Sequence, residues 1–154
     1  MIVDGGNPNY SSLDGVLFNK TQTNLLNYPM GKSNTSYVVP NTVTTISRVS
    51  YNPFLTSITL PNGLRTIGGY VFESSKLTSV FIPDSVTSYY GNPFINSDSL
   101  TRIDVGENNL NYKSIDGVIY SKNGKTLLDY PGGKTETSFE IPSGVETIPS
   151  QWMW

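Results

Sequence analysis

Three Gly-Lys-Ser/Thr tripeptides are the residues of this sequence that most resemble a catalytic motif. They begin at Gly31, Gly124 and Gly133, and the same residue types close the phosphate-binding loop of nucleotide-hydrolysing enzymes. That loop needs a second glycine five residues before the Gly-Lys pair. The three positions in question hold Leu26, Ile119 and Leu128. The spacing fails three times, so turn formation is the better interpretation of all three tripeptides.

Acidic residues offer the next possible chemistry. Asp98, Asp104, Glu107 and Asn109 lie near one another in the sequence and carry oxygen ligands of the kind that calcium prefers. They lack the dense acidic alternation of a dedicated calcium loop, so a calcium site stays an open alternative. A glycosidase would need two carboxylates across a cleft, and the sequence indicates no cleft. We predict no catalytic residue, no cofactor and no dedicated metal site, and hence a protein that is not an enzyme.

The composition narrows the fold and the possible partners. No residue is Cys, His or Ala, whereas Ser, Thr and Asn supply 19, 16 and 15 of the 154 positions. Without Cys or His there are no disulfides, no thiolate nucleophiles and no histidine base. Without Ala, the best helix former, strands and turns are predicted in place of helices. Charged residues are only 14% and the net charge is −2, which disfavours nucleic acid as a partner.

The sequence shows neither a membrane-spanning segment nor a targeting signal. No apolar run approaches the ~20 residues that a membrane helix needs, so membrane insertion is not predicted. Residues 1–20 lack the basic-then-apolar order of a signal peptide. The protein is therefore either cytoplasmic or directed elsewhere by a segment outside this sequence.

Two nested repeats organise the chain. Residues 10–46 align with residues 112–148 without a gap, and 18 of the 37 positions are identical. A shorter repeat lies inside this 102-residue period, marked by a Pro or Gly at steps of 21, 22, 23 and 36 residues. The markers are Pro40, Pro61, Pro83, Gly106 and Pro142. Units of this size cannot bury their apolar edges alone, so they are expected to stack into one solenoid.

One short unit shows how the repeat is expected to fold. In residues 55–60, Ile58 and Leu60 alternate with polar residues, which is the period of a strand with one buried face. Pro61 lacks the N–H that a ladder needs and ends this strand. Phe72 is predicted to fill the centre of the coil. Tyr51 and Phe94 are predicted at the equivalent places of the neighbouring units.

The 36-residue units carry inserts at about residues 10–30 and 112–132. Residues 115–120 and 126–130 are two strand-like runs joined through an Asn-Gly turn, the strongest short hairpin signal. Residues 13–18 and 25–28 are expected to repeat this arrangement with a looser turn. We therefore predict two β-hairpins that protrude from the solenoid or pack along it, within one domain spanning residues 1–154.

These motifs resemble a known family. The L-T-S-I-x-[IL]-P unit and the S-[IL]-D-G-V insert are similar to the BspA-type leucine-rich repeats of bacterial surface proteins, over nearly the whole chain. The family often has a Cys three residues after the central Phe, where Ser75 and Ser97 stand here and are expected to be buried with a partner. Tyr89 and Tyr90 replace the usual Ile-Gly. The resemblance implies a β-rich leucine-rich-repeat solenoid of the α/β class, with few or no regular helices, in a secreted or surface-displayed module often associated with adhesion.

Binding is expected on strand residues that point away from the core. Alternation places Val38, Thr59, Phe81, Asp104 and Glu140 in one outward column, with Arg102 in the column beside it. An exposed aromatic residue beside an arginine is the composition of a binding hot spot, although Phe81 could instead pack on a hairpin or on a neighbouring part of a longer parent chain. The ten tyrosines offer a second possibility, sugar stacking, but most recur at equivalent positions, which favours packing.

The predicted function is a non-enzymatic extracellular interaction module that adheres to a host or neighbouring-cell protein or glycan. The alternative is a structural spacer with no ligand of its own. Neither residues 1–3 nor residues 151–154 resemble a polar capping unit, so the chain is expected to be a fragment of a longer repeat protein. Uncapped ends also predict end-to-end self-association.

Overall fold

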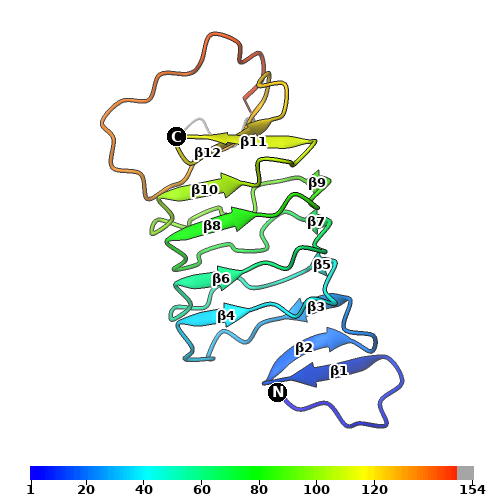
Figure 1. Ribbon diagram of the computed structural model, residues 1–154. Coiled ribbons are helices and arrows are strands. Elements are labelled where there is room, and N and C mark those ends of the chain that lie inside the picture. The colour runs from blue at the N-terminus through cyan, green and yellow to red at the C-terminus, as the bar shows by residue number, and fades with distance from the viewer. Residues whose placement is uncertain (149–154) are drawn as a thin grey trace.

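The computed structural model describes residues 1–148, and this part of the chain contains strands and turns but no helix (Figure 1). It winds into stacked coils, each of which contributes a strand to a front wall and a strand to a back wall. The front wall holds β4 (Ser36–Val38), β6 (Ser57–Thr59), β8 (Ser79–Ile82) and β10 (Arg102–Val105). The back wall holds β3 (Asn24–Asn27), β5 (Thr45–Ile46), β7 (Thr66–Ile67) and β9 (Ser88–Tyr89). The predicted leucine-rich-repeat solenoid is confirmed.

Alternation sets the direction of each side chain on the front wall. In β6, Ile58 is buried between two exposed neighbours, as a period of two predicts. Parallel pairing aligns equivalent residues of successive coils, so that Val38 lies beside Thr59. In the same way Asp104 lies beside Phe81. Each strand therefore sends one set of residues into the core and another into solvent.

A ladder of threonines fastens the coils together at the start of the front-wall strands. The N–H groups of Thr56, Thr78 and Thr101 donate to the carbonyl oxygen of the threonine one coil earlier, at 2.9, 3.1 and 2.9 Å. Their hydroxyls reach the same oxygens at 3.1, 3.4 and 3.1 Å. Because each step gains two hydrogen bonds, a threonine recurs two residues before each inward-pointing strand residue.

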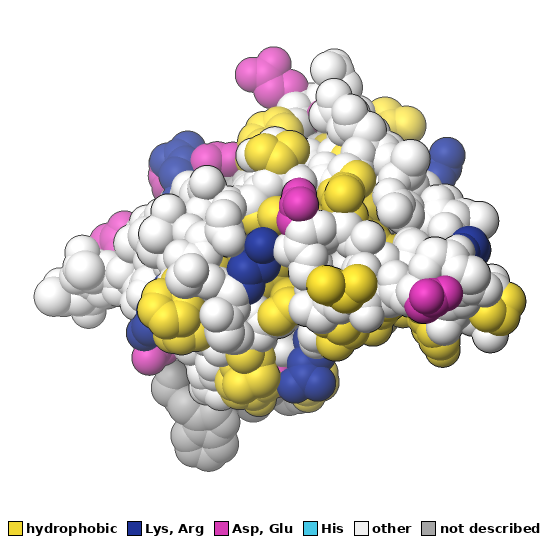
Figure 2. All heavy atoms as spheres, turned by 90° about the horizontal axis from the view of Figure 1, so that it is seen from below, with side chains coloured by type: hydrophobic (Ala, Val, Ile, Leu, Met, Phe, Trp, Pro, Cys, Tyr) yellow, Lys and Arg dark blue, Asp and Glu magenta, His cyan; other side chains and the backbone are white. Residues whose placement is uncertain are grey.

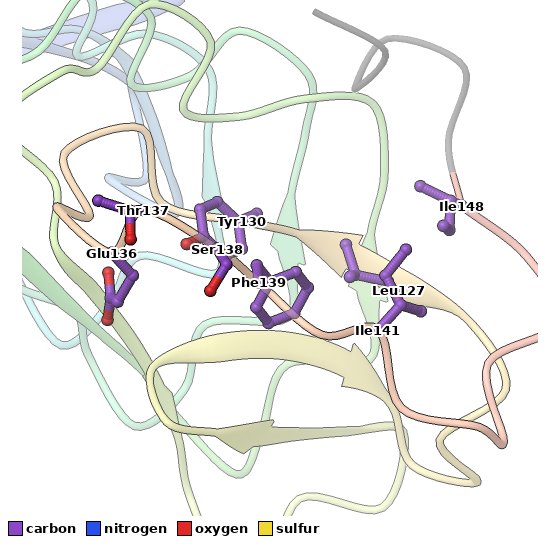
Figure 3. A pocket seen from close by; sticks show the side chains of 8 residues that line it. All are labelled: Leu127, Tyr130, Glu136, Thr137, Ser138, Phe139, Ile141 and Ile148. Atoms are coloured by element: carbon purple, nitrogen blue, oxygen red, sulfur yellow. The ribbon is translucent and has the colours of Figure 1, made fainter.

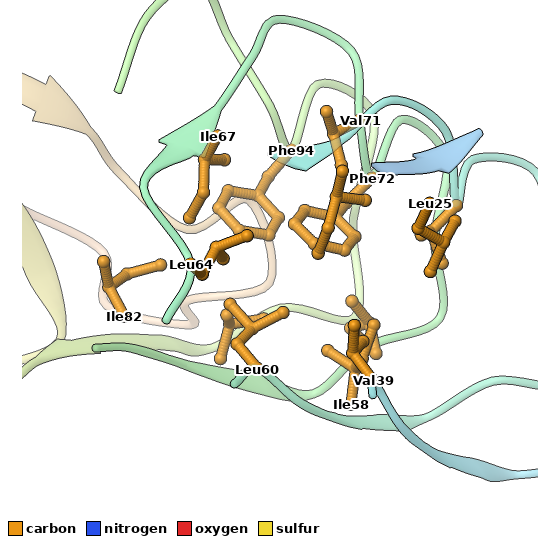
Figure 4. Close-up of a cluster of buried hydrophobic side chains, with 14 of the residues drawn as sticks. Leu25, Val39, Ile58, Leu60, Leu64, Ile67, Val71, Phe72, Ile82 and Phe94 are labelled. Carbon is orange, nitrogen blue, oxygen red and sulfur yellow. The ribbon is translucent and has the colours of Figure 1, made fainter. Parts of the chain in front are cut away.

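The core between the walls is a continuous stack of aliphatic side chains around two phenylalanines (Figure 4). The rings of Phe72 and Phe94 stack with centroids 5.1 Å apart and planes 8° apart, which confirms both as central residues. The prediction of Tyr51 at the equivalent place is wrong, because this side chain is 40% exposed. The buried Val49 takes that place, since its N–H donates to the carbonyl of Val71 at 2.8 Å and so aligns it with Phe72.

Two buried serines stand where the family often has cysteine. Ser75 Oγ and Ser97 Oγ lie 3.2 Å apart, and Ser97 Oγ also donates to the carbonyl oxygen of Phe72 at 2.9 Å. Both side chains are satisfied by hydrogen bonds between neighbouring coils, which offsets the cost of burying a hydroxyl. The expectation that each serine is buried with a partner is confirmed.

Each insert is a three-stranded antiparallel sheet. The first consists of β1 (Tyr10–Leu13), β2 (Val16–Asn19) and β3, and the second of β11 (Tyr112–Ile115), β12 (Val118–Ser121) and β13 (Leu127–Asp129). The prediction that residues 13–18 and 115–120 form single strands is wrong, because an Asp-Gly turn divides each run. Asp116 and Gly117 have φ values of 50° and 76°, the left-handed pair that a two-residue hairpin turn requires.

The last strand of each insert pairs with the back-wall segment of the coil that follows it. The third strand of the first insert, β3, pairs in parallel with β5 and so joins the wall. The second insert repeats this geometry through a parallel bridge between Thr126 and Thr147. The 102-residue repeat also preserves individual hydrogen bonds. Ser12 Oγ accepts a hydrogen bond from the Val3 N–H at 2.9 Å, and the equivalent Ser114 Oγ accepts one from the Val105 N–H at 3.0 Å.

Candidate binding surface

The outward side chains of the front wall form one continuous surface, which we call the strand face. Four of the predicted site residues, Val38, Thr59, Phe81 and Asp104, lie on it in one column. A second column beside it contains Ser36, Ser57, Ser79 and Arg102. The structure therefore brings together five of the six predicted residues.

Two large apolar side chains stand out of the strand face. Val38 is 70% exposed, although Val39 beside it is buried. Phe81 is 56% exposed, although Val80 and Ile82 on either side of it are buried. The alternative that Phe81 packs on a hairpin of this chain is wrong, because a packed ring would not keep more than half its surface in solvent. Packing on a neighbouring part of a longer parent chain stays an alternative. An exposed ring on a rigid strand loses little conformational freedom on binding, so it is a suitable anchor for a partner.

A charged pair adjoins this aromatic residue. Arg102 Nε donates to Asp104 Oδ2 at 2.5 Å, and Asp104 raises the pKa of the guanidinium through this hydrogen bond and its charge. The turn of the second insert limits how the arginine can move, since a Cβ added to Gly117 would meet Arg102 Cγ at 2.8 Å. The second insert thus lies against β10, at the end of the strand face that carries Arg102 and Asp104.

The sixth predicted residue, Glu140, does not belong to the column. It is exposed, but the segment from Ser138 to Ile141 forms no strand. The equivalent residues of the first repeat form β4, which pairs with β6 of the next coil. No such neighbour follows in the part of the chain that the structure describes, so the backbone of this segment has no ladder to join.

The last described coil has an open apolar hollow of about 400 Å³ (Figure 3). Five lining residues repeat the positions of core residues in the first repeat: Leu127, Tyr130, Phe139, Ile141 and Ile148. Even the ring pair is repeated, because Tyr130 and Phe139 lie 4.7 Å apart where Tyr28 and Tyr37 lie 5.0 Å apart. Phe139 is nevertheless 41% exposed. Within residues 1–148, the hollow is therefore an edge of the core that no further coil covers.

The opposite end of the stack also exposes apolar groups. Figure 2 shows this end, where hydrophobic side chains lie among polar and charged ones. Ile2 is 95% exposed and Met30 is 54% exposed. Both ends thus provide apolar surface for the predicted self-association, which stays a prediction.

Sequence reasoning missed a buried polar pair. Tyr89 Oη donates to Asp129 Oδ2 at 2.8 Å, and both side chains are more than nine-tenths buried. Burial raises the pKa of the Asp129 carboxyl to about 7, despite the opposing effect of the tyrosine hydrogen bond. A signal existed, because Tyr89 replaces the usual Ile and Asp129 stands where the first repeat has Asn27. Each of these two residues differs from its repeat equivalent, and each supplies the hydrogen-bond partner of the other.

The acidic residues do not assemble into a site. Within residues 1–148, no group of three or more His, Cys, Asp or Glu side chains is placed to hold a metal ion. The side-chain amide of Asn109, one of the possible calcium ligands, instead makes hydrogen bonds to backbone groups. Its amide donates to the carbonyls of Pro83 and Val86 at 3.0 Å each, and its oxygen accepts two N–H groups. The same described residues contain no helix long and apolar enough to cross a membrane.

Comparison with solved structures finds bacterial proteins of the same fold. A leucine-rich repeat protein from Eubacterium ventriosum is 23% identical, with a TM-score of 0.66, and the match covers 92% of this chain and 54% of that one. The pneumococcal vaccine antigen PcpA is 18% identical, with a TM-score of 0.65, over 97% and 53% of the two chains. A leucine rich cell surface protein from Faecalibacterium prausnitzii is 30% identical, with a TM-score of 0.63, over 71% and 30%.

The chain thus spans about half the length of the first two of these structures. A comparison with curated protein sequences finds no match. The family model of the BspA type leucine rich repeat region matches residues 16–127 in six copies, which is more than half of the chain. With the stacked coils and the threonine ladder, this match shows that the chain belongs to the BspA-type leucine-rich repeat family.

Proposed function

We propose that this chain is a non-enzymatic interaction module, displayed on a bacterial cell surface, which adheres to a protein of a host or neighbouring cell through its strand face. One observation carries the proposal: Phe81 is 56% exposed in the middle of a regular, paired wall, beside the Arg102–Asp104 pair. An exposed aromatic anchor with an adjacent arginine matches the composition of protein-binding hot spots.

The family and its neighbours support the location. One structural neighbour is named as a cell surface protein and another as a vaccine antigen, and both share the solenoid. A non-enzymatic role agrees with a strand face whose only charged side chains, within the described residues, are Arg102 and Asp104, already bonded to each other. Catalysis by two carboxylates or by a nucleophile and base would need groups that this face does not hold.

The test is binding of the purified chain to immobilised matrix proteins and to intact host cells, measured by surface plasmon resonance and flow cytometry. A Phe81→Ser, Arg102→Ala, Asp104→Ala variant should lose at least tenfold in affinity while keeping its circular dichroism spectrum. Phe54→Ser is the matched control, because Phe54 is 45% exposed but lies outside the strand face.

Two outcomes would count against the proposal. Equal binding by the triple variant would place the contact elsewhere on the molecule. No binding to any protein or cell of the panel would favour the alternative function, a structural spacer that separates other domains from the surface.

A further inference from the structure

A second hollow, of about 240 Å³, lies between two coils on the segments that follow β5 and β7. Four of its lining residues carry functional groups that could hold a ligand: Arg48, Tyr51, Tyr70 and Glu73. It shares no residue with the strand face and none with the open end of the stack. Its volume is below the roughly 300–1,000 Å³ of pockets for drug-sized ligands, so it suits a single ring.

The hollow exists because neighbouring coils differ in length. Val49 lies three residues after Ile46, whereas the aligned Phe72 lies five residues after Ile67. The longer coil therefore carries two extra residues at this point, and they extend beyond the shorter coil below. Gly69 and Tyr70 lie on this longer stretch, so they overhang the shorter coil and form one side of the hollow.

Two tyrosines present their rings from strained backbone positions. Tyr51 and Tyr70 both have a φ of 62°, and their side chains are 40% and 60% exposed. A bulky residue in the left-handed region is strained, and such outliers are enriched where proteins clamp ligands. The turn itself does not need an aromatic residue, because Ser74 and Asn96 have positive φ at positions equivalent to Tyr51 in the next two coils.

Polar groups of both signs surround the rings. The Arg48 guanidinium lies 5.9 Å from the centre of the Tyr51 ring, and its Nε donates to Ser50 Oγ at 3.2 Å. Glu73 lines the same hollow, and its carboxylate raises the pKa of the Tyr51 phenol. The hollow is thus lined by hydrogen-bond donors and acceptors and by two tyrosines, and the charges of Arg48 and Glu73 cancel.

We propose that this hollow binds one neutral sugar ring, between Tyr51 and Tyr70 and in hydrogen-bonding reach of Arg48 and Glu73. A pyranose has polar hydroxyls on its rim and apolar C–H groups on its faces. The rim matches the guanidinium and carboxylate, and the faces match the aromatic rings, whose quadrupole attracts C–H edges. An ion would gain little, because a guanidinium and a carboxylate of opposite charge line the same hollow.

The test is titration of the isotope-labelled chain with neutral methyl pyranosides and N-acetylglucosamine at millimolar concentration. At least one sugar should shift the amide resonances of Ser50 and Gly69 in the nuclear magnetic resonance spectrum. Tyr70→Gly removes one ring but suits the left-handed backbone, so it should abolish the shifts without lowering the free energy of unfolding. Glu73→Gln should weaken binding at least tenfold. Tyr10→Ser is the control, since Tyr10 is 47% exposed and remote in sequence.

Three results would overturn the inference. The first is the absence of shifts with every neutral sugar of the series. The second is unchanged binding by Tyr70→Gly. The third is binding of anionic sugars alone, abolished by Arg48→Gln, which would make the hollow an anion site. The triple variant of the strand face should bind sugar as the parent does, so this inference and the proposed function can fail separately.

Discussion

Replacing the buried Asp129 by Asn should stabilise the protein at neutral and alkaline pH. The carboxyl is 2% exposed, and burial raises its pKa to about 7 from an unfolded value of 3.8. The folded chain therefore keeps this proton between about pH 4 and pH 7, where the unfolded chain has lost it. Stability from this group is fully present below its unfolded pKa and is lost as the pH rises through about 7.

The size of the change in the free energy of unfolding follows from the folded and unfolded pKa values of Asp129. Each unit between them is worth about 1.4 kcal/mol, so the free energy of unfolding falls by about 4 kcal/mol across this range through Asp129 alone. Asparagine has almost the same shape and cannot ionise, and its amide oxygen can still accept the Tyr89 hydroxyl. The first repeat already uses Asn27 at the equivalent position.

Urea unfolding followed by circular dichroism measures the effect at about pH 4 and about pH 8. Asp129→Asn should match the parent within about 1 kcal/mol at the lower pH and exceed it by up to about 4 kcal/mol at the higher pH. Asn27→Asp is the matched control, and its effect should be smaller because Asn27 is only half-buried. A variant no more stable than the parent at the higher pH would refute the reasoning.

Three further changes test the packing, each by urea unfolding or by light scattering. Phe72→Ala should cost about 3–5 kcal/mol, because it removes half of the stacked pair at the centre of the core; a loss below about 1 kcal/mol would contradict that position. Tyr37→Phe should stabilise by about 1 kcal/mol, since the buried Tyr37 hydroxyl has no hydrogen-bond partner among residues 1–148 and the second repeat uses Phe139 there. Phe139→Asp should reduce self-association of the chain in light scattering, because it places a charge in the open hollow; unchanged association would exclude this end as the contact.

Much of the fold could be predicted from the sequence because the same pattern of strand and turn residues recurs in several units. The alternation around Ile58 gives the strand and its buried side, and Pro61 gives the end of that strand. Asp-Gly is a turn-forming pair, yet the run that contains each pair reads as one strand. Apolar residues continue on both sides of Asp116-Gly117, so hydrophobicity alone hides the reversal that the two positive φ values impose.

The features that the sequence did not indicate depend on differences between coils. A repeat pattern describes only what the coils have in common, so it does not contain these differences. Tyr51 fits the repeat when residues are counted from Ile46, but the hydrogen bonds to the next coil align Val49 with the core instead. The Tyr89–Asp129 pair joins residues 40 positions apart in different kinds of unit, so no local spacing indicates it. Both hollows likewise result from what an adjacent coil does or does not cover.

Comparison of the two long repeats therefore shows which features depend on the local sequence and which depend on the stacking of the next coil. Residues 37–46 and 139–148 form the same turn, with Val43 and Val145 each donating an N–H to the preceding proline carbonyl, at 3.0 and 2.9 Å. Their burial differs, however, because residues 55–64 cover the first copy and nothing in the described chain covers the second. Local sequence thus sets the turn in both copies, and the next coil sets whether the same aromatic and aliphatic side chains become core or surface.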